Sequence, residues 1–290
     1  MPTLREVKKR IRTVISTRRI TRAMEMVSAA KLRRAQQRVE QAKPYAAKLD
    51  EMLSHLAAGA TGEIVHPYFE ERPIKKRTLV VISSDKGLCG SFNANVNRRA
   101  MQWIKEDAGL ADLEIVAIGK KARDYFRRRQ WPIARYEGDW SGVMDYNRMR
   151  DIVSYLTNRF VESETDRISL VYTRFISLVK YEVVVDQYLP VPKPEIGAED
   201  EIGGREYIFE PNSEQIYAAL MPSYATTKLV TALAESFASE HGSRMIAMNA
   251  ATKNAGEMID RLTLDYNKAR QAQITKELLE IVSGAEALAG

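Results

Sequence analysis

The chain has 290 residues, of which 45% are hydrophobic and 28% are charged, a balance typical of a globular protein with one sizeable core. No stretch approaches the ~18 uninterrupted apolar residues that indicate a membrane-spanning helix. The single cysteine, Cys89, excludes an intramolecular disulfide. The net charge of +6 is uneven, because residues 1–48 hold 14 Lys or Arg against 3 acidic residues, which leaves −5 for the rest.

This basic segment predicts a partner with an acidic surface. Nucleic acid phosphates, anionic lipid and carboxylate-rich protein all fit that description. The alternative is a solvated face that only keeps a long helix soluble.

Residues 1–57 predict a long amino-terminal helix. Apolar or small residues recur along it at alternating spacings of three and four, and both runs share one heptad register, which is the pattern of a coiled-coil seam. The seam positions are Leu4, Val7, Ile11, Val14, Leu32, Ala35, Val39, Ala42, Ala46, Leu49, Leu53 and Leu56. At ~1.5 Å per residue this helix spans roughly 80 Å. Pro44 predicts a local kink.

The seam is interrupted between residues 15 and 31. The heptad positions there are polar: Arg18, Thr21, Glu25 and Ser28. The apolar residues stand elsewhere, at Ile20, Met24, Met26 and Val27. This shift predicts that the helix gives up its intramolecular seam here and offers a different apolar face to another protein, where methionine supplies adaptable packing.

After a breaker region at residues 59–73, residues 74–190 predict a globular α/β domain. Strands are expected at residues 78–83, 113–119, 133–136, 168–174 and 181–189, with helices at 92–105, 120–129 and 145–163. That order predicts a mostly parallel, Rossmann-like sheet wrapped by helices, with an antiparallel pair at its edge.

The loop at residues 84–93, SDKGLCGSFN, follows the first strand, where a nucleotide would bind in many α/β folds. Its two glycines match neither GxGxxG nor GxxxxGK[ST]. Asp85 and Lys86 are more readily a turn residue and a solvated cation than catalytic groups. The three histidines show no metal-ligand spacing with one another or with Cys89. The sequence therefore predicts no catalytic, cofactor or metal site.

Residues 191–212 are a proline-containing connecting loop, and residues 213–290 predict a second long helix. A second 3,4 series runs along it: Thr227, Val230, Ala234, Phe237, His241, Arg244, Met248, Ala251, Ala255, Met258, Leu262, Asp265, Ala269, Ala272, Lys276 and Leu279. Neither terminal helix can bury its apolar seam residues alone, so an antiparallel coiled coil of the two helices is expected. Two separate amphipathic helices lying on the middle domain are the alternative.

Four segments carry a resemblance to a known family. They are ITRAMEMVSAAKLRRAQ at residues 20–36, SDKGLCGSFN at 84–93, SRMIAMNAATKNAGEMI at 243–259 and YNKARQAQITKELLEIVSGAEAL at 266–288. They closely resemble the gamma subunit of the F-type ATP synthase of bacteria. The resemblance covers the whole chain, with the segments in the family's order and spacing.

The resemblance implies the central rotor shaft of a proton-translocating, rotary ATP synthase. Its coiled coil would lie inside the hexamer of alpha and beta subunits, and its α/β domain beside the epsilon subunit and the ring of c subunits. One copy per complex is implied, at the cytoplasmic face of the bacterial cell membrane, with no membrane insertion, no nucleic acid, no cofactor and no catalytic site of its own. A second cysteine for redox control is missing, so thiol switching is not expected.

The resemblance also implies a set of coupling contacts. By position in the motifs these are Met24, Arg244, Arg270, Gln271, Thr275 and Glu277. The apolar carboxyl-terminal tip, which matches the part of the family that enters a hydrophobic bearing, holds Leu278, Leu279, Ile281, Val282 and Leu288. The alternative role for each polar residue is helix solubility.

Two other classes of protein remain open from the residues. A nucleic-acid-binding coiled coil would use the basic helix, although in such proteins the basic segment lies outside the zipper. A flavodoxin-like enzyme would use the loop at residues 84–93. Copurification with alpha and beta subunits separates all three.

Overall fold

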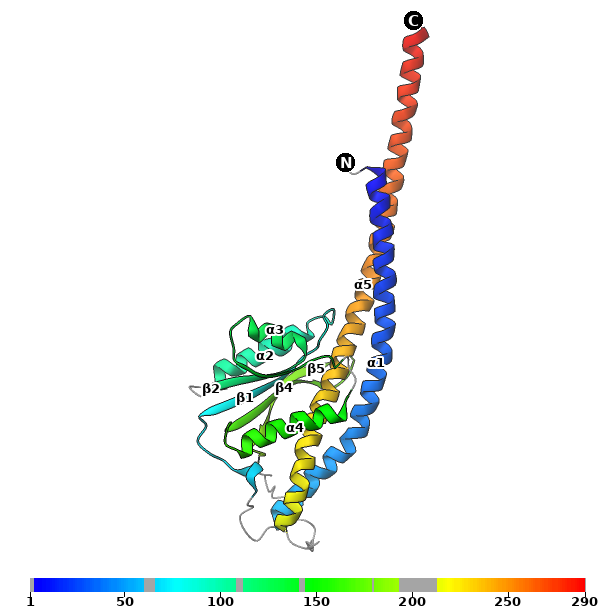
Figure 1. Cartoon of the computed structure of the whole chain (residues 1–290). Helices are drawn as coiled ribbons and strands as arrows, with labels where there is room; N and C mark the ends of the chain where they lie inside the picture. Colours follow the sequence, from blue (N-terminus) through cyan, green and yellow to red (C-terminus); the bar gives the residue numbers. More distant parts are fainter. Residues whose placement is uncertain are drawn as a thin grey trace. The chain divides into compact units, whose positions relative to one another are not determined.

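The computed structural model describes residues 3–59, 66–107, 112–140, 144–178, 180–192 and 213–289. Two long helices, α1 (Leu4–Gly59) and α5 (Ser213–Ala289), flank an α/β domain in the sequence (Figure 1). Contacts between residues group the chain into two compact units, residues 1–28 with 245–290 and residues 29–244. Both long helices contribute to each unit. The predicted connecting loop lies outside the described residues from residue 193 onward.

The unit of residues 29–244 contains a five-stranded sheet with the order β3-β2-β1-β4-β5. The strands are β1 (Lys76–Ile82), β2 (Asp112–Ile118), β3 (Ile133–Glu137), β4 (Arg167–Phe175) and β5 (Tyr181–Leu189). Neighbouring strands are parallel except β4 and β5, which are antiparallel. The predicted Rossmann-like sheet is confirmed, with strand ends that move by one or two residues.

Helices cover both faces of this sheet, which explains its continuous apolar strands. The helices α2 (Phe92–Asp107) and α3 (Lys120–Arg127) lie on one face, and α4 (Tyr146–Val161) lies on the other (Figure 1). In β1, Leu79 and Val81 pack in the same core cluster as Phe92 and Val96 of α2 and Phe126 of α3. A short 3-10 helix, η1 (Pro67–Phe69), lies in the predicted breaker region. Its first residue is a proline, which suits the start of a helix.

Within residues 29–244, α1 and α5 run antiparallel. The Tyr217 hydroxyl donates a hydrogen bond to the Leu53 carbonyl at 3.4 Å. Further along α5, a Cβ at Gly242 would lie 3.9 Å from Leu32, so low residue numbers in α1 meet high numbers in α5. The predicted seam is buried here at Leu32, Ala35, Val39, Leu49, Leu53 and Leu56. The helix continues through Pro44.

The unit of residues 1–28 and 245–290 is also an antiparallel helix pair. The Thr252 hydroxyl donates to the Thr21 hydroxyl at 2.8 Å, and the Asn249 amide donates to the Glu25 carboxylate at 2.9 Å. The predicted coiled coil of the two terminal helices is therefore confirmed in this unit as well.

One expectation about this stretch of α1 is wrong. The heptad positions Thr21 and Ser28 are buried, so the helix keeps its seam between residues 15 and 31 with polar side chains. The Thr21 hydroxyl bonds the Arg18 carbonyl and Thr252, and the Ser28 hydroxyl bonds the Met24 carbonyl at 2.7 Å. Hydrogen bonding removes the penalty for burying these hydroxyls. The second apolar face is present too, because Ile20, Met26 and Val27 are each more than half exposed.

The α5 seam differs from the prediction in two ways. Its register changes at Met258 and Asp265, and the predicted seam positions Ala272, Lys276 and Leu279 are exposed. Met248, Ala255, Leu262 and Ala269 lie inward as expected. The alternate positions are Ile259 and Tyr266, which are partly buried, whereas Met258 and Asp265 are exposed. Either choice satisfies a heptad spacing, and the structure takes the one that buries the isoleucine and the tyrosine ring.

Candidate functional site

The carboxyl-terminal part of α5 extends beyond the paired region of its unit. Up to Ala269, side chains of α5 are still partly buried at heptad spacing, and from Arg270 to Ala285 every side chain is exposed. We call residues 270–285 the free segment. Its hydrogen bonds in the described structure run along the helix itself, from Thr275 to the Gln271 carbonyl at 3.0 Å and from Gln273 to Glu277 at 2.9 Å.

The free segment carries an apolar stripe. Ile274, Leu278, Ile281 and Val282 recur at helical spacing and so share one face, with Leu279 beside it. Their exposed fractions run from 45% for Ile274 to 68% for Ile281. Apolar side chains gathered on an exposed face mark an interaction surface. The predicted coupling residues Arg270, Gln271, Thr275 and Glu277 lie on the same segment, whereas the Leu288 side chain lies outside the described ones.

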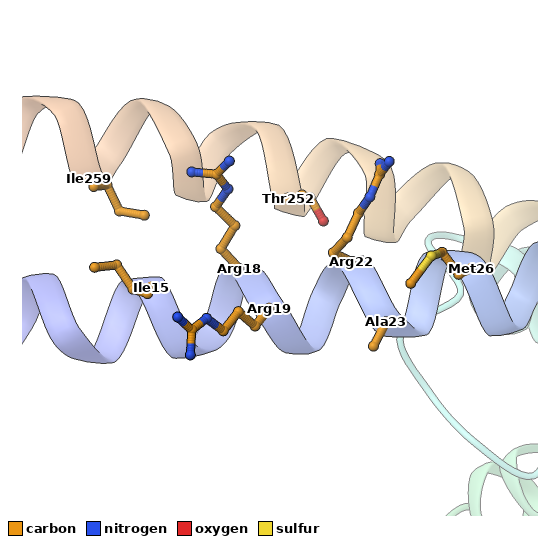
Figure 2. Close-up of a pocket in the computed structure, with 8 residues that line it drawn as sticks. All are labelled: Ile15, Arg18, Arg19, Arg22, Ala23, Met26, Thr252 and Ile259. Atoms are coloured by element: carbon orange, nitrogen blue, oxygen red, sulfur yellow. The ribbon is translucent and has the colours of Figure 1, made fainter.

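A basic groove follows the helix pair in the same unit (Figure 2). It has a volume of about 760 Å³ and is lined by Ile15, Arg18, Arg19, Arg22, Ala23, Met26, Thr252 and Ile259. Arg22 forms an ion pair with Glu25 at 3.1 Å. Within the described part of the chain, no ion pair involves Arg18 or Arg19. The groove combines cations with apolar walls, which suits an acidic partner.

Met24 is half-buried, whereas Met26 at the groove is 59% exposed. Both lie in the motif that suggested a partner surface. The structure therefore brings Met26 to that surface more fully than Met24.

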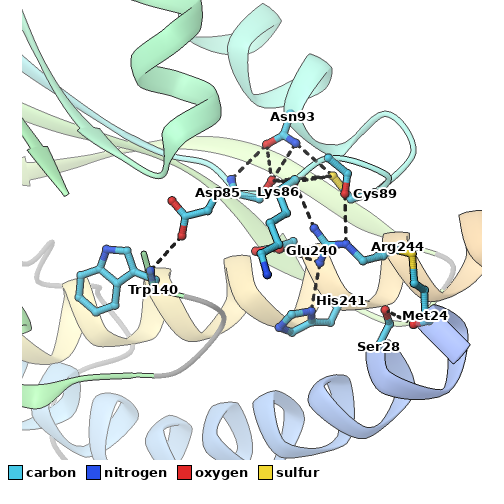
Figure 3. Close-up of polar contacts among 12 residues, drawn as sticks. Met24, Ser28, Asp85, Lys86, Cys89, Asn93, Trp140, Glu240, His241 and Arg244 are labelled. Atoms are coloured by element: carbon cyan, nitrogen blue, oxygen red, sulfur yellow. Dashed lines mark hydrogen bonds and ion pairs between the residues drawn. The ribbon is translucent and has the colours of Figure 1, made fainter. Parts of the chain in front are cut away.

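Arg244 lies in the other unit and is bonded inside the chain (Figure 3). Its Nε donates to the Gly87 carbonyl at 3.3 Å, and its Nη2 donates to the Lys86 carbonyl at 3.2 Å. Its Nη1 is 2.7 Å from the Glu240 carboxylate and 3.3 Å from His241 Nδ1. The side chain is only 9% exposed. All three nitrogens of the guanidinium are thus engaged within residues 29–244.

Burial sets the protonation of this cluster. Burial, together with the positive charges of Arg244 and Lys31, lowers the pKa of His241 to about 4. His241 is therefore neutral at pH 7, and Nδ1 accepts from the guanidinium. Burial also raises the pKa of Glu240, while Arg244 opposes that effect. An isolated buried carboxylate would be costly, and the ion pair with Arg244 at 2.7 Å offsets that cost.

The loop at residues 84–91 is held from both sides. The Asp85 carboxylate accepts from the backbone N–H of Trp140 at 2.9 Å (Figure 3). It also accepts from the backbone N–H of Lys120 at 3.0 Å, so it caps the start of α3. The Ser84 N–H donates to the Asn93 side chain at 3.1 Å. Cys89 is buried, and burial raises the pKa of its thiol.

This loop does not have the form of a phosphate cradle. Such cradles direct backbone N–H groups at the ligand, whereas here two backbone carbonyls face Arg244. The cavity between the loop and α5 has a volume of about 30 Å³, far below the ~300 Å³ at the small end of ligand pockets. In the described residues, no group of three His, Cys, Asp or Glu side chains is placed to hold a metal ion, and no helix is long and apolar enough to cross a membrane.

Sequence reasoning missed two parts of these surfaces. From the sequence, Arg18 is a polar heptad position and Arg19 is one cation of a basic segment, and neither is assigned to a groove. Glu240 was not singled out, although its spacing of four from Arg244 is the usual helical ion-pair spacing. That spacing was the available signal.

Comparisons with known proteins agree with these observations. The ATP synthase family model matches residues 3–288. The chain is 44% identical to the ATP synthase gamma chains of Pelotomaculum thermopropionicum and Moorella thermoacetica, over 99% of this chain and 100% of each relative. The gamma chain of Protochlamydia amoebophila is 41% identical over the same shares.

Solved structures share the fold. A chain of the Euglena gracilis mitochondrial ATP synthase matches with a TM-score of 0.68 and 19% identity, covering 98% of this chain and 94% of that one. A chain of the Tetrahymena thermophila enzyme matches with a TM-score of 0.58 and 23% identity, covering 80% and 99%. On the full-length matches to its bacterial relatives, the chain belongs to the gamma-chain family of ATP synthases.

Proposed function

We propose that this gamma chain is the central-stalk subunit of an ATP synthase. As the rotor shaft, it couples ion flow through the membrane sector to ATP synthesis or hydrolysis. In this proposal it holds no catalytic site, and the chemistry belongs to its partner subunits. The observation that carries the proposal is the unit of residues 1–28 and 245–290, in which a coiled coil ends in a free segment whose described side chains are all exposed.

The mechanical part of the proposal rests on the helix pair. A coiled coil resists bending because its side chains interlock along the seam, so it transmits torque. A single chain has no threefold symmetry, and it therefore presents three different faces to three identical beta subunits. Contacts that differ between sites shift each site toward a different conformation and a different nucleotide affinity. Rotation of the shaft moves these states from one site to the next.

The partner surfaces fit this role. The groove around Arg18 and Arg19 suits carboxylate-rich surfaces of the alpha and beta subunits. On the free segment, Arg270 and Gln271 offer donors for carboxylates and carbonyls, with Thr275 and Glu277 one turn further along. The stripe at Leu278, Leu279, Ile281 and Val282 suits a hydrophobic bearing. Met24 would contribute to the apolar face of α1.

The remaining partners follow from the family. The similar Euglena and Tetrahymena chains come from assemblies that include a c-ring, which supports a place for the α/β domain beside the c-ring and the epsilon subunit. One copy per complex, held at the cytoplasmic face of a bacterial membrane by these partners, is the corresponding location.

Arg244 has an internal part in this proposal. It bonds two carbonyls of the loop at residues 84–91 while it stands on α5, so it fastens the α/β domain to the helix within one unit. Torque that enters either element then passes to the other. Arg244 acts in coupling as a positioning residue of the shaft.

The absence of a catalytic role rests on the same loop. Its carbonyls face a cation of the chain itself, and the space beside them is about 30 Å³. An isothermal titration of the purified chain with Mg-ATP should give no saturable binding in the micromolar range. Stoichiometric binding that Lys86→Ala abolishes would overturn this part of the proposal and restore the nucleotide-binding alternative.

Rotation itself is tested in the assembled complex. With the alpha/beta hexamer fixed to a surface and a probe attached through Lys105→Cys on the exposed side of α2, ATP should drive rotation in one direction. Cys89 is buried, so labelling should favour the introduced thiol. The same complex without ATP is the control. ATP hydrolysis with a stationary probe would contradict the rotor assignment.

A further inference from the structure

A second cavity lies within residues 29–244, where α1, α5 and β4 meet. Its volume is about 200 Å³, and it is lined by Ala46, Leu49, Asp50, Tyr172, Tyr224, Thr227, Lys228 and Thr231. A single water needs only ~10–15 Å³ of such space. Asp50 is exposed at the surface, so the cavity is accessible to a small molecule. The coupling surfaces described above use none of these residues.

Several polar groups around this cavity make no hydrogen bonds or ion pairs within the described residues, and one of them, the Thr231 hydroxyl, is buried. Among the residues that the structure describes, no hydrogen bond or ion pair involves the Lys228 ammonium, the Asp50 carboxylate or the side-chain hydroxyls of Tyr224, Thr227 and Thr231. The Thr231 hydroxyl is fully buried, and buried polar groups are normally bonded. The Lys228 ammonium lies 5.7 Å from the centre of the Tyr224 ring. The cavity thus presents one cation, three hydroxyls and one carboxylate to whatever enters it.

Two carboxylates, those of Asp186 and Asp50, act on the Lys228 ammonium. The Asp186 carboxylate is the other nearby acid, and it accepts from the Tyr172 hydroxyl at 2.8 Å and from Arg174 at 3.3 Å. Burial lowers the pKa of Lys228, although Asp186 and Asp50 pull it upward. Burial raises the pKa of Asp50 against the effect of Lys228. Lys228 is half-buried and Asp50 is exposed, so both charged groups can bond a ligand that enters the cavity.

These groups specify a ligand. The ammonium and the hydroxyls are donors and call for an anion with several acceptor oxygens. The Asp50 carboxylate is an acceptor, so the same ligand should also carry an O–H group that donates to it. A phosphate group that retains a proton has both features, whereas sulfate carries no proton at neutral pH and would oppose Asp50 with like charge.

We propose that the cavity at Lys228, Asp50 and Thr231 binds a protonated phosphate group, either as inorganic phosphate or as a small phosphate monoester. Lys228 and the hydroxyls hold the acceptor oxygens, and Asp50 accepts from the phosphate O–H. The ligand lies between the two long helices and β4 of the sheet, so it ties these elements together. The proposal does not depend on the rotor function.

The first test is a calorimetric titration of the purified full-length chain with inorganic phosphate, glycerol phosphate and sulfate in parallel. Saturable binding of at least one phosphate compound, at least tenfold tighter than sulfate, is expected. The phosphate arm and the glycerol phosphate arm distinguish the two forms of the ligand. No saturable binding of either, or sulfate that binds as tightly as phosphate, would overturn the proposal.

Variants then assign the roles. Lys228→Met should weaken phosphate binding at least tenfold, and Asp50→Asn should bring the phosphate-to-sulfate ratio close to one. Lys48→Met, which removes an exposed cation from the same part of α1, is the matched control and should leave affinity unchanged. Thermal unfolding checks that each variant is folded.

The nearly isosteric Thr231→Val covers the case in which Lys228→Met does not fold. It removes only the unbonded hydroxyl and should weaken binding several-fold. Phosphate affinity that stays the same in both Thr231→Val and Asp50→Asn would overturn the assignment of this cavity.

Discussion

Two regions of the same helix are used in opposite ways. Residues 232–244 of α5 are buried at every position, whereas the free segment at residues 270–285 is exposed at every position. Yet the buried region holds Glu235, Glu240, His241 and Arg244, and the exposed one holds a stripe of leucine, isoleucine and valine. Hydrophobicity alone would have predicted the reverse.

The difference shows how one helix serves two purposes. In the buried region, Arg244 and Glu240 pair at 2.7 Å, which offsets the cost of burying their charges. Burial raises the pKa of Glu235, which favours its neutral form. In the free segment, apolar groups lie exposed, and in the proposed function another protein covers them. Substitutions should therefore damage the fold in the first region and the assembly in the second.

The largest loss of stability is expected from changes in α1, at the seam positions of residues 29–244. Replacing Val39 and Leu49 together by Asp removes buried apolar area that stabilises by ~1.5–3 kcal/mol per side chain and adds two charges in its place. The helix pair of residues 29–244 should unfold, as measured by urea denaturation and by loss of assembly. Asp at the exposed positions Ala47 and Met52 is the matched control. Normal ATP hydrolysis and proton pumping by a complex with the Val39/Leu49 variant would contradict the assignment of an antiparallel shaft.

Arg244 should give the next largest effect. Arg244→Ala leaves Glu240 as an unpaired buried carboxylate, which costs about 3–5 kcal/mol in comparable buried pairs. Adding Glu240→Gln should restore part of that loss, because the uncompensated charge is then gone. Urea unfolding of the two single variants and the double variant measures the coupling. Strictly additive effects would mean that the two side chains do not interact.

The same cluster predicts a dependence of stability on pH. The pKa of His241 is about 4 in the folded chain against an ordinary 6.5, so between these values the unfolded chain binds more protons. Acidification from pH 6.5 to 4 should then remove roughly 3 kcal/mol of stability through this residue. His241→Gln should lose this component, so the stability difference between wild type and variant should shrink as pH falls. Unfolding curves at pH 7, 5.5 and 4.5 test it, and parallel pH profiles would contradict it.

The Arg244 cluster also marks the limit of what the sequence could predict. Strands such as β1 were predictable within two residues, because runs like Leu79 to Ile82 are continuously apolar and end at turn-forming residues. The contact between Arg244 and Lys86 joins residues 158 apart in the chain, and no local pattern encodes it. The choice of Ile259 over Met258 in the seam likewise depends on the partner helix, since both residues satisfy the spacing.

The loop at residues 84–91 should show a smaller effect with an internal control. Asp85→Ala removes the acceptor for two backbone N–H groups and should cost about 1–2 kcal/mol, the usual loss for a helix cap. Lys86→Ala changes an exposed side chain and should cost less than about 0.5 kcal/mol. Hydrolysis by complexes with either variant should stay within a few-fold of wild type. A selective loss of turnover in Lys86→Ala would return this loop to the list of catalytic candidates.

The smallest effect on the fold, and the most direct test of the contrast, is expected in the free segment. Leu278 and Ile281 are 57% and 68% exposed, so replacing both by Asp should change the unfolding free energy of the purified chain by less than about 0.5 kcal/mol. The same pair of changes should weaken association with alpha and beta subunits, because the apolar stripe would carry two charges into its partner.

Asp at Lys276 and Gln273, which lie off the stripe, provides a control with the same acidic side chains. Assembly measured by gel filtration should fall for the stripe variant more than for the control. Equal losses in both would mean that charge alone matters and that the stripe is not the contact surface, whereas a drop in chain stability would mean that the free segment is part of the fold after all.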